Sequence, residues 1–151
     1  MEWVKKTFDQ LTKEELYTLL QHRVNVFVVE QECPYPEIDG RDPECLHIWK
    51  EEAGEVVAYC RLVPPAEGEE HYSIGRVLIQ EKYRRKGHAR KLMDYAIDVL
   101  VNEMGVQGIA LHGQEHLRHF YASFGFEEVS DVYLEDGIPH VDMVKSTLKR
   151  L

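Results

Sequence analysis

Apolar residues recur every three or four positions in two stretches of the chain, and each stretch predicts an amphipathic helix. The clearer one covers residues 89–101, where charged residues occupy the opposite helical face. The other begins after Thr12, which stands three residues before Glu15 and so forms a capping box, and it runs toward Val24. Residues 26–29 continue this helix or form a second short one.

Short apolar runs bounded by turn residues predict strands rather than helices. These runs cover residues 4–8, 46–50, 56–63, 73–79, 108–112 and 141–144. Gly54, between the second and third runs, predicts a hairpin, and Asp136-Gly137 predicts the turn of a β-ribbon near the C-terminus. A short helix over residues 117–124, ended by Gly125, precedes that ribbon.

The element order is therefore β-α-(α)-β-β-β-α-β-α-β-β, which predicts a single domain over residues 1–151. Its fold class is α/β (α+β), with a mixed, mostly antiparallel sheet that is flanked by helices and contains one β-α-β crossover. A length of 151 residues, 44% of them hydrophobic, is sufficient for one core and excludes a disordered chain.

The sequence contains no signal for a membrane, for secretion or for a metal. No apolar run approaches the roughly 20 residues that a membrane span requires, and the first residues lack the apolar core of a signal peptide. We therefore expect a cytoplasmic protein with no membrane partner. Cys33, Cys45 and Cys60 are odd in number and show no C-x-x-C spacing, so we expect neither a disulfide framework nor a metal site.

Positive charge is concentrated in one segment of an acidic chain. The net charge is −9, yet residues 82–91 hold six basic residues and no acidic one, so the rest of the chain carries −15. A surface this acidic repels nucleic acid, and the basic segment lacks an interleaved aromatic surface on which bases could stack. We therefore expect no nucleic-acid partner.

The basic segment joins a predicted strand to the N-terminus of the predicted helix 89–101, with Gly87 at the junction. Backbone N–H groups and the positive end of the helix dipole point outward at such a terminus and favour a phosphate. Cations there oppose the dipole, so the arrangement costs stability unless an anion binds. Gly87 permits close approach of the backbone, and the sequence holds neither a Walker loop nor a G-x-G-x-x-G motif. We expect a pyrophosphate-binding site.

This segment, Arg84-Arg85-Lys86-Gly87-His88-Ala89, resembles the [QR]-x-x-G-x-[GA] acetyl-CoA signature of the GNAT N-acetyltransferase superfamily. Residues 120–126, Phe-Tyr-Ala-Ser-Phe-Gly-Phe, are similar to the F-Y-x-x-x-G-F element of the same family. Residues 23–31, 33–40 and 135–140 extend the resemblance over nearly the whole chain and look like the ElaA-like branch. The resemblance implies the GNAT acyl-CoA N-acyltransferase fold.

The resemblance also implies an enzyme that transfers the acetyl group of acetyl-CoA directly to an amine of an acceptor within a ternary complex. Acetyl-CoA is then a co-substrate, held by a strand that pairs with its pantetheine arm, by the amides of the signature loop and by an amide side chain. The positions that match these roles are Val77, Leu78, Ile79, Arg84, Arg85, Lys86, Gly87, His88, Ala89, Arg90 and Gln114.

In this resemblance Tyr121 lies near the sulfur and protonates the departing CoA thiolate as the general acid, although it also falls on the apolar face of its helix. Many family members place a glutamate base on the strand before the signature, where this chain has Gly75-Arg76. Histidine titrates in the right range for a base, and our first candidate is His140, because it lies in the Gly-Ile-Pro-His element of the ElaA-like branch, near where the cleft should open. The other candidates are His112, His47 and Glu30.

The acceptor side is expected to be shaped by Arg23, Glu30, Gln31 and Asp39. The acidic loop that contains the last of these favours a cationic amine, carried by a small molecule or a peptide. A non-catalytic acyl-CoA-binding sensor is the alternative to the enzyme. A homodimer and the identity of the acceptor amine both stay open.

Overall fold

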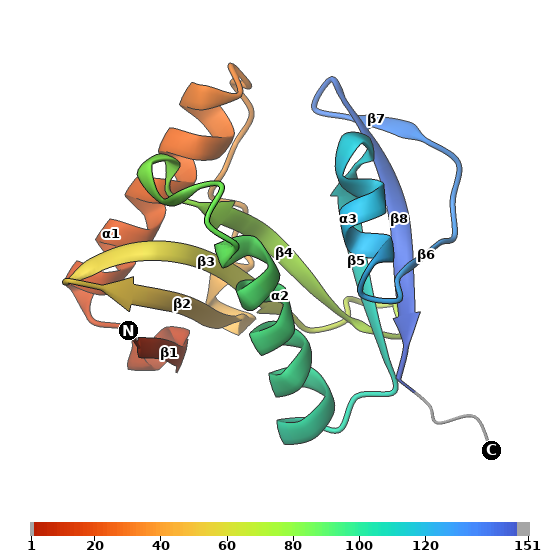
Figure 1. Ribbon diagram of the computed structural model, residues 1–151, viewed down its shortest axis with the longest axis horizontal. Coiled ribbons are helices and arrows are strands. Elements are labelled where there is room, and N and C mark those ends of the chain that lie inside the picture. Colours follow the sequence, from red (N-terminus) through yellow and green to blue (C-terminus); the bar gives the residue numbers. More distant parts are fainter. Residues whose placement is uncertain (1, 148–151) are drawn as a thin grey trace.

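The computed structural model describes residues 2–147, whose strands form one sheet in the order β1-β2-β3-β4-β5-β8-β6, with β7 paired to β8 (Figure 1). All pairs are antiparallel except β4 with β5. The strands are β1 (Glu2–Thr7), β2 (Leu46–Glu52), β3 (Glu55–Val63), β4 (Tyr72–Ile79), β5 (Gly108–Gln114), β6 (Glu127–Glu128), β7 (Tyr133–Glu135) and β8 (Ile138–Ser146). The predicted mixed, mostly antiparallel sheet is confirmed.

Three α-helices cover the two faces of this sheet. They are α1 (Lys13–Arg23), α2 (His88–Asp98) and α3 (Arg118–Ala122). Ile48 of β2 packs in one core cluster with Leu92 of α2, whereas its neighbour Trp49 packs in a second cluster with Leu19 of α1. Because successive strand residues point to opposite faces, α1 lies on one face of the sheet and α2 on the other.

The predicted elements are present, with their ends moved by a few residues. The capping box of α1 is confirmed, because Glu15 N donates to Thr12 Oγ1 at 3.0 Å and Thr12 N donates to Glu15 Oε1 at 2.8 Å. The chain continues from α1 as a π-helix over Val24–Glu30, and from α2 as a π-helix over Val99–Glu103. The two-residue strand β6 has no counterpart among the predicted elements. Residues 1 and 148–151 of the predicted domain lie outside the described residues.

The strands β4 and β5 separate along their length. Only the pairs Tyr72–Ile109 and Ser73–Ala110, at the start of both strands, join them. Beyond these pairs the two strands move apart, as Figure 1 shows. We call the unpaired stretch the β4–β5 divergence. It leaves backbone N–H and C=O groups of β4 without a neighbouring strand, in the middle of the sheet.

Candidate active site

The loop between β4 and α2 is closed by Arg84. Its Nε donates a hydrogen bond of 3.0 Å to the carbonyl of Ile79, the last residue of β4. The guanidinium also donates to both carboxylate oxygens of Glu30, at 2.8 and 2.9 Å. The Arg84 side chain is therefore bonded to other residues of the protein, and these bonds fix the path of the loop.

The N-terminus of α2 presents a row of open backbone amides. Within residues 2–147 no backbone or side-chain group accepts a hydrogen bond from the N–H groups of residues 85–90, and the first bond of the helix runs from Lys91 N to Gly87 O at 3.3 Å. Gly87 caps the helix with a φ of 81°, and a Cβ atom there would meet nothing within 4 Å. Open amides, the helix dipole and free space together suit a phosphate group.

The positive charge around this terminus is smaller than the sequence implies. Half of the six basic residues of the segment are bonded to residues far away in the sequence. Lys82 pairs with the carboxylate of Glu55 and Arg84 with that of Glu30, whereas Arg90 donates to the neutral hydroxyl of Ser123 and keeps its charge. The other three, Arg85, Lys86 and Lys91, are exposed and have no ion pair in the described part of the chain.

His88 and Ala89 contribute to the site through their backbone. The His88 side chain is buried, and its Nδ1 has no hydrogen-bond partner within residues 2–147. Burial lowers the pKa of His88, so the imidazole stays neutral inside the protein. Ala89 is half-buried and carries only a methyl group. Only their N–H groups therefore face a ligand.

The last residues of β4 border the divergence. Leu78 is buried in the cluster beneath α1, whereas Val77 and Ile79 pack partly against the cluster beneath α2. Leu78 and Ile79 pair with β3 on one side only, and no residue of β4 beyond Ser73 pairs with β5 within residues 2–147. The backbone here can accept an additional extended chain as a sheet partner.

Tyr121 of α3 lies against β5 at the level of the β4–β5 divergence. A Cβ atom built on Gly113 would meet the Tyr121 ring at 2.9 Å, so this glycine is what allows the ring to approach the strand. Burial, with a smaller effect of Cys60, raises the pKa of Tyr121 to about 12. The hydroxyl has no hydrogen-bond partner among residues 2–147. It is therefore a protonated, unengaged donor at neutral pH.

The segment that follows the π-helix of α1 spans the wide end of the divergence. Glu30 binds Arg84 beside β4, and Gln114 at the end of β5 donates from Nε2 to Gln31 Oε1 at 3.5 Å. Two residues after Gln31, Cys33 Sγ donates to the carbonyl of Asp136 in the β7–β8 turn at 3.4 Å. The predicted residues Glu30, Gln31 and Gln114 are thus brought together at one end of the opening.

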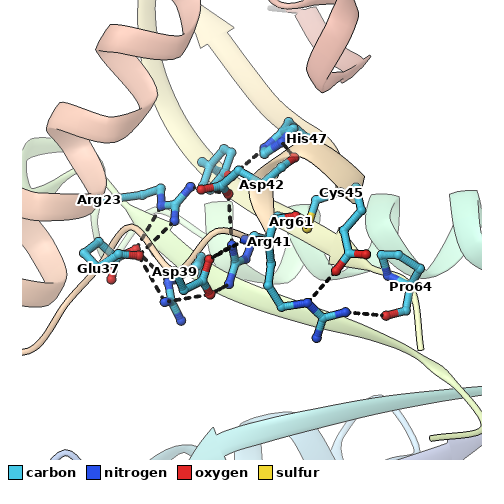
Figure 2. A network of polar contacts seen from close by, with 12 residues as sticks. Arg23, Glu37, Asp39, Arg41, Asp42, Cys45, His47, Arg61 and Pro64 are labelled. Carbon is cyan, nitrogen blue, oxygen red and sulfur yellow. Dashed lines mark hydrogen bonds and ion pairs between the residues drawn. The ribbon is translucent and has the colours of Figure 1, made fainter. Parts of the chain in front are cut away.

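A buried network of arginines and carboxylates lies between the end of α1 and β3 (Figure 2). Arg23 donates from Nε to Glu37 Oε2 at 2.9 Å and from Nη1 to Asp42 Oδ1 at 2.7 Å. Arg61 of β3 donates to the same Asp42 oxygen at 2.9 Å, and its Nη2 donates to Asp39. The guanidinium of Arg23 is almost completely enclosed, with 1% of the side chain exposed. This places Arg23 within the protein interior.

Arg76 extends the network to the bulge of β4. Its Nε donates to Glu37 Oε2 at 2.6 Å, and its Nη2 lies 3.4 Å from Asp39 Oδ2. Arg76 has a φ of 52°, a conformation that a side-chain-bearing residue seldom adopts, at the point where the register between β3 and β4 shifts. The residue that occupies the position of the family's usual base is therefore a cation already bound to two carboxylates.

The network removes the free negative charge that the sequence suggests for the acidic loop. Burial alone would raise the pKa of Asp39 and of Asp42, but hydrogen bonds from Arg61 and Arg23 outweigh it and hold both well below their usual range. Each carboxylate is ionised and paired with a guanidinium. The expected preference for a cationic acceptor therefore has no basis in these residues.

The candidate histidines differ in what their ring nitrogens contact. His47 is buried, with Nδ1 2.8 Å from the Tyr59 hydroxyl and Nε2 3.0 Å from the Asp42 carbonyl. His140 donates from Nδ1 to the carbonyl of Ile138 at 2.7 Å and lies under the Tyr133 ring. In contrast, His112 is exposed on β5. Its Nδ1 lies 2.6 Å from Asp142 Oδ1.

The partners Glu37, Asp42, Arg61 and Arg76 do not appear among the residues predicted for the site. One signal for them is present in the sequence. Arg61 stands in the otherwise apolar run 56–63, and a charge in a buried strand requires a counter-charge. The run of acids at residues 37, 39 and 42 could have supplied it.

No helix within residues 2–147 is long and apolar enough to cross a membrane. In the same residues no three His, Cys, Asp or Glu side chains come close enough to hold a metal ion.

Comparison with known proteins gives a consistent result. Residues 9–126 match the acetyltransferase (GNAT) family. The chain is 44% identical over 145 residues to a UPF0039 protein of Schizosaccharomyces pombe, with 95% of each chain covered, and 39% identical over 153 residues to the protein ElaA of Escherichia coli, with 99% of each covered. A crystal structure of an acyl-CoA N-acyltransferase from Pseudomonas aeruginosa superposes with a TM-score of 0.91 at 39% identity, covering 96% of this chain and 99% of the other.

Proposed function

This chain belongs to the acetyltransferase (GNAT) family, and we propose that it transfers the acetyl group of acetyl-CoA directly to the amine of an acceptor within a ternary complex. Family membership and the acyl-CoA N-acyltransferase fold support an acyltransferase. The observation that carries the more specific proposal is the row of open amides at residues 85–90, beside a strand without a neighbour and an unengaged tyrosine hydroxyl.

Acetyl-CoA is proposed to bind along the β4–β5 divergence. Its pyrophosphate accepts hydrogen bonds from the amides of residues 85–90, with Arg85 and Lys86 supplying charge from the surface. Its pantetheine arm lies beside residues 77–79 as an added strand, which would satisfy backbone groups that have no partner strand. Gln114 supplies an amide side chain at the wide end. When bound, acetyl-CoA supplies an activated carbonyl carbon and a thiolate leaving group.

Tyr121 is proposed to be the general acid. Because its pKa is raised to about 12, the hydroxyl is protonated at neutral pH and can donate its proton to a departing thiolate. The acceptor enters from the opposite face of the sheet, where Glu30 and Gln31 lie. In this proposal Arg23 and Asp39 support that side from within the charge network, and a histidine on the same face, His140 or His112, accepts the proton of the amine.

Transfer without an acetyl-enzyme intermediate at Cys45 or Cys60 is supported by the state of these two thiols. Cys60, the thiol that influences Tyr121, is completely buried, and burial raises its pKa to about 12. Burial likewise raises the pKa of Cys45 to about 11. Neither side chain is a thiolate at neutral pH, so neither is a competent nucleophile.

The experiment that tests the function measures CoA release with a thiol reagent. Purified protein is mixed with acetyl-CoA and a panel of primary amines that includes an α-amino acid, an amino-acid amide, a diamine and an amino sugar. We expect at least one amine to stimulate CoA release. In Tyr121→Phe that stimulated rate falls about 100-fold or more, whereas the calorimetric Kd for acetyl-CoA stays within about twofold.

The matched control is Tyr17→Phe, which alters a tyrosine that is 74% exposed on α1 and should leave both quantities unchanged. Binding of acetyl-CoA with no stimulation by any amine would contradict transfer and favour a sensor. Equal activity of Tyr121→Phe and wild type would remove the assigned acid.

A further inference from the structure

His112 and Asp142 form a hydrogen-bonded pair on adjacent strands. They stand directly opposite each other in the β5–β8 ladder, with His112 Nδ1 2.6 Å from Asp142 Oδ1. A carboxylate next to Nδ1 fixes the tautomer in which Nδ1 carries the proton, which leaves Nε2 with a free lone pair. The His112 side chain is 47% exposed, so Nε2 is accessible from solvent.

The carboxylate of this pair is held by other groups on the same side of the sheet. The Tyr133 hydroxyl of β7 donates a short hydrogen bond to the same Asp142 oxygen, and Asp142 N donates to Ser130 Oγ at 2.9 Å. Burial would raise the pKa of Asp142, but the hydrogen bonds from His112 and Tyr133 outweigh it and keep it below the usual range. Asp142 is therefore an ionised and fixed partner.

The surrounding titratable groups are few. His140 stacks on Tyr133 with ring centroids 6.2 Å apart, and Glu135 Oε2 lies 3.6 Å from His140 Nε2. The charges of His112 and, to a smaller extent, His140 help to lower the pKa of Asp142. His112 itself has Asp142 as its one ion-pair partner within residues 2–147.

His112 lies on β5 beside the β4–β5 divergence and next to the residue that faces Tyr121, the proposed acid. His112 is two residues beyond Ala110, the last residue of β5 that pairs with β4. The next residue, Gly113, faces the Tyr121 ring. Because neighbouring strand residues point to opposite faces, His112 and Tyr121 lie on opposite faces of the sheet at the same level of the divergence.

We propose that His112 is the general base of the acyl transfer and that Asp142 and Tyr133 position it. The inference rests on the proposed function. The lone pair of the acceptor amine forms a bond to the thioester carbonyl carbon, and the proton of that nitrogen passes to His112 Nε2. The carbon–sulfur bond breaks, and the thiolate takes the hydroxyl proton of Tyr121. His112 then releases its proton to water and Tyr121 regains one, so amine and thioester become amide and thiol.

The other candidates are less suited to this role. His140 is 9% exposed and covered by Tyr133, so its ring has little access to an amine. Both ring nitrogens of His47 are engaged, and that side chain is buried. Both carboxylate oxygens of Glu30 accept hydrogen bonds from Arg84, so this side chain is already occupied.

The test compares His112→Asn and His140→Asn with wild type, using acetyl-CoA and the amine from the panel that gives the fastest CoA release. We expect the stimulated rate of His112→Asn to fall about 10²-fold or more, and its pH–rate profile to lack the rise with pH that we expect in wild type from deprotonation of the base. The calorimetric Kd of His112→Asn for acetyl-CoA should stay within about twofold of the wild-type value. The matched control, His119→Asn, changes an exposed histidine of α3 and should behave as wild type.

A second variant separates positioning from catalysis. Asp142→Asn keeps an oxygen that accepts from Tyr133 but removes the charge beside the imidazole. We expect its rate to fall and the rise in its pH–rate profile to move to lower pH, because the imidazolium loses its counter-charge. A purely structural role of Asp142 would leave the position of that rise unchanged.

The outcomes distinguish this inference from the proposed function. No amine-stimulated CoA release by wild type would overturn both. An active wild type with a fully active His112→Asn would overturn only the assignment of His112, and a matching loss in His140→Asn would transfer the role to that residue.

Discussion

The loop before α2 and the charge network beneath α1 both contain basic residues near turns of the chain, but their cations have different partners. In the network, Arg23 and Arg61 each donate to two acidic residues. In the loop, Arg85 and Lys86 are exposed and have no ion pair within residues 2–147. A cation that is paired with a carboxylate of the protein stabilises the fold. An unpaired cation at a helix N-terminus is instead available to an anionic ligand.

The two regions also differ in how their charges affect the free energy of unfolding. Breaking a buried ion pair leaves a charge without water or partner and is strongly destabilising. Exposed cations at the N-terminus of α2 instead oppose the helix dipole, so the unliganded protein is less stable for having them. Stability and binding should therefore respond in opposite ways to substitutions in the two regions.

The largest effect is expected in the network. In Arg23→Met the volume is roughly kept, but Glu37 and Asp42 each lose a hydrogen-bonded counter-charge. We expect the free energy of unfolding in urea to fall by about 3–5 kcal/mol. The control is Arg41→Met, which breaks the ion pair with Glu44 and the hydrogen bond to the Pro64 carbonyl and should cost less than about 2 kcal/mol. Similar losses in both variants would contradict the distinction between the regions.

The network also predicts a loss of stability in acid. The folded pKa values of Asp39 and Asp42 lie below the unfolded value of about 3.9, so their contribution is fully present above that pH. It is lost as the pH falls through the folded values. Urea unfolding between pH 7 and pH 2.5 should show a decline that begins near pH 4 and is shallower in Asp39→Asn. An identical slope in the variant would exclude Asp39 from this linkage.

An intermediate effect is expected in the loop, with opposite signs for binding and stability. Arg85→Gln and Lys86→Gln should each weaken acetyl-CoA binding by about 1 kcal/mol, or roughly fivefold, and less at high salt. Each should also raise the free energy of unfolding of the unliganded protein by up to about 0.5 kcal/mol, because a charge that opposes the dipole is removed. Calorimetry and urea unfolding measure the two quantities. A loss of stability in either variant would instead mean that the substituted cation stabilises the fold.

The smallest effect is expected at the ion pair between Glu30 and Arg84. Glu30→Gln removes the exposed ion pair with Arg84 but keeps a side chain of the same shape. The free energy of unfolding should change by less than about 1 kcal/mol, and acetyl-CoA affinity by less than about threefold. A larger loss of affinity would mean that Glu30 sets the geometry of the loop.

The sequence predicts well those features whose partners lie a few residues apart. The capping box of Thr12 and Glu15 and the turn at Asp136-Gly137 each depend on local geometry, and both are present. The family motifs are local in the same sense, and the assignment to the acetyltransferase family is confirmed.

Features that join distant segments are not predicted. Arg23 and Asp39 are expected to line the acceptor side, yet their bonds to Asp42 and Arg61 depend on how α1, its following loop and β3 pack. His112 and Asp142 are 30 residues apart and meet only because β5 and β8 pair in one register. Hydrophobic periodicity indicates the elements, but it contains no information on which polar side chains face each other across them.

The most direct test of the account is calorimetric titration of acetyl-CoA into wild type, Gly87→Glu and Gly105→Glu. The two glycines lie beyond opposite ends of the helical segment that begins with α2, both have positive φ, and a Cβ atom at either meets nothing within 4 Å. Backbone strain is therefore matched, and only Gly87→Glu places a carboxylate at the open amides. We predict binding in wild type and Gly105→Glu, and a loss of about 100-fold or more in Gly87→Glu. Equal affinity in all three proteins, or no binding in wild type, would contradict the assignment of this loop to acetyl-CoA.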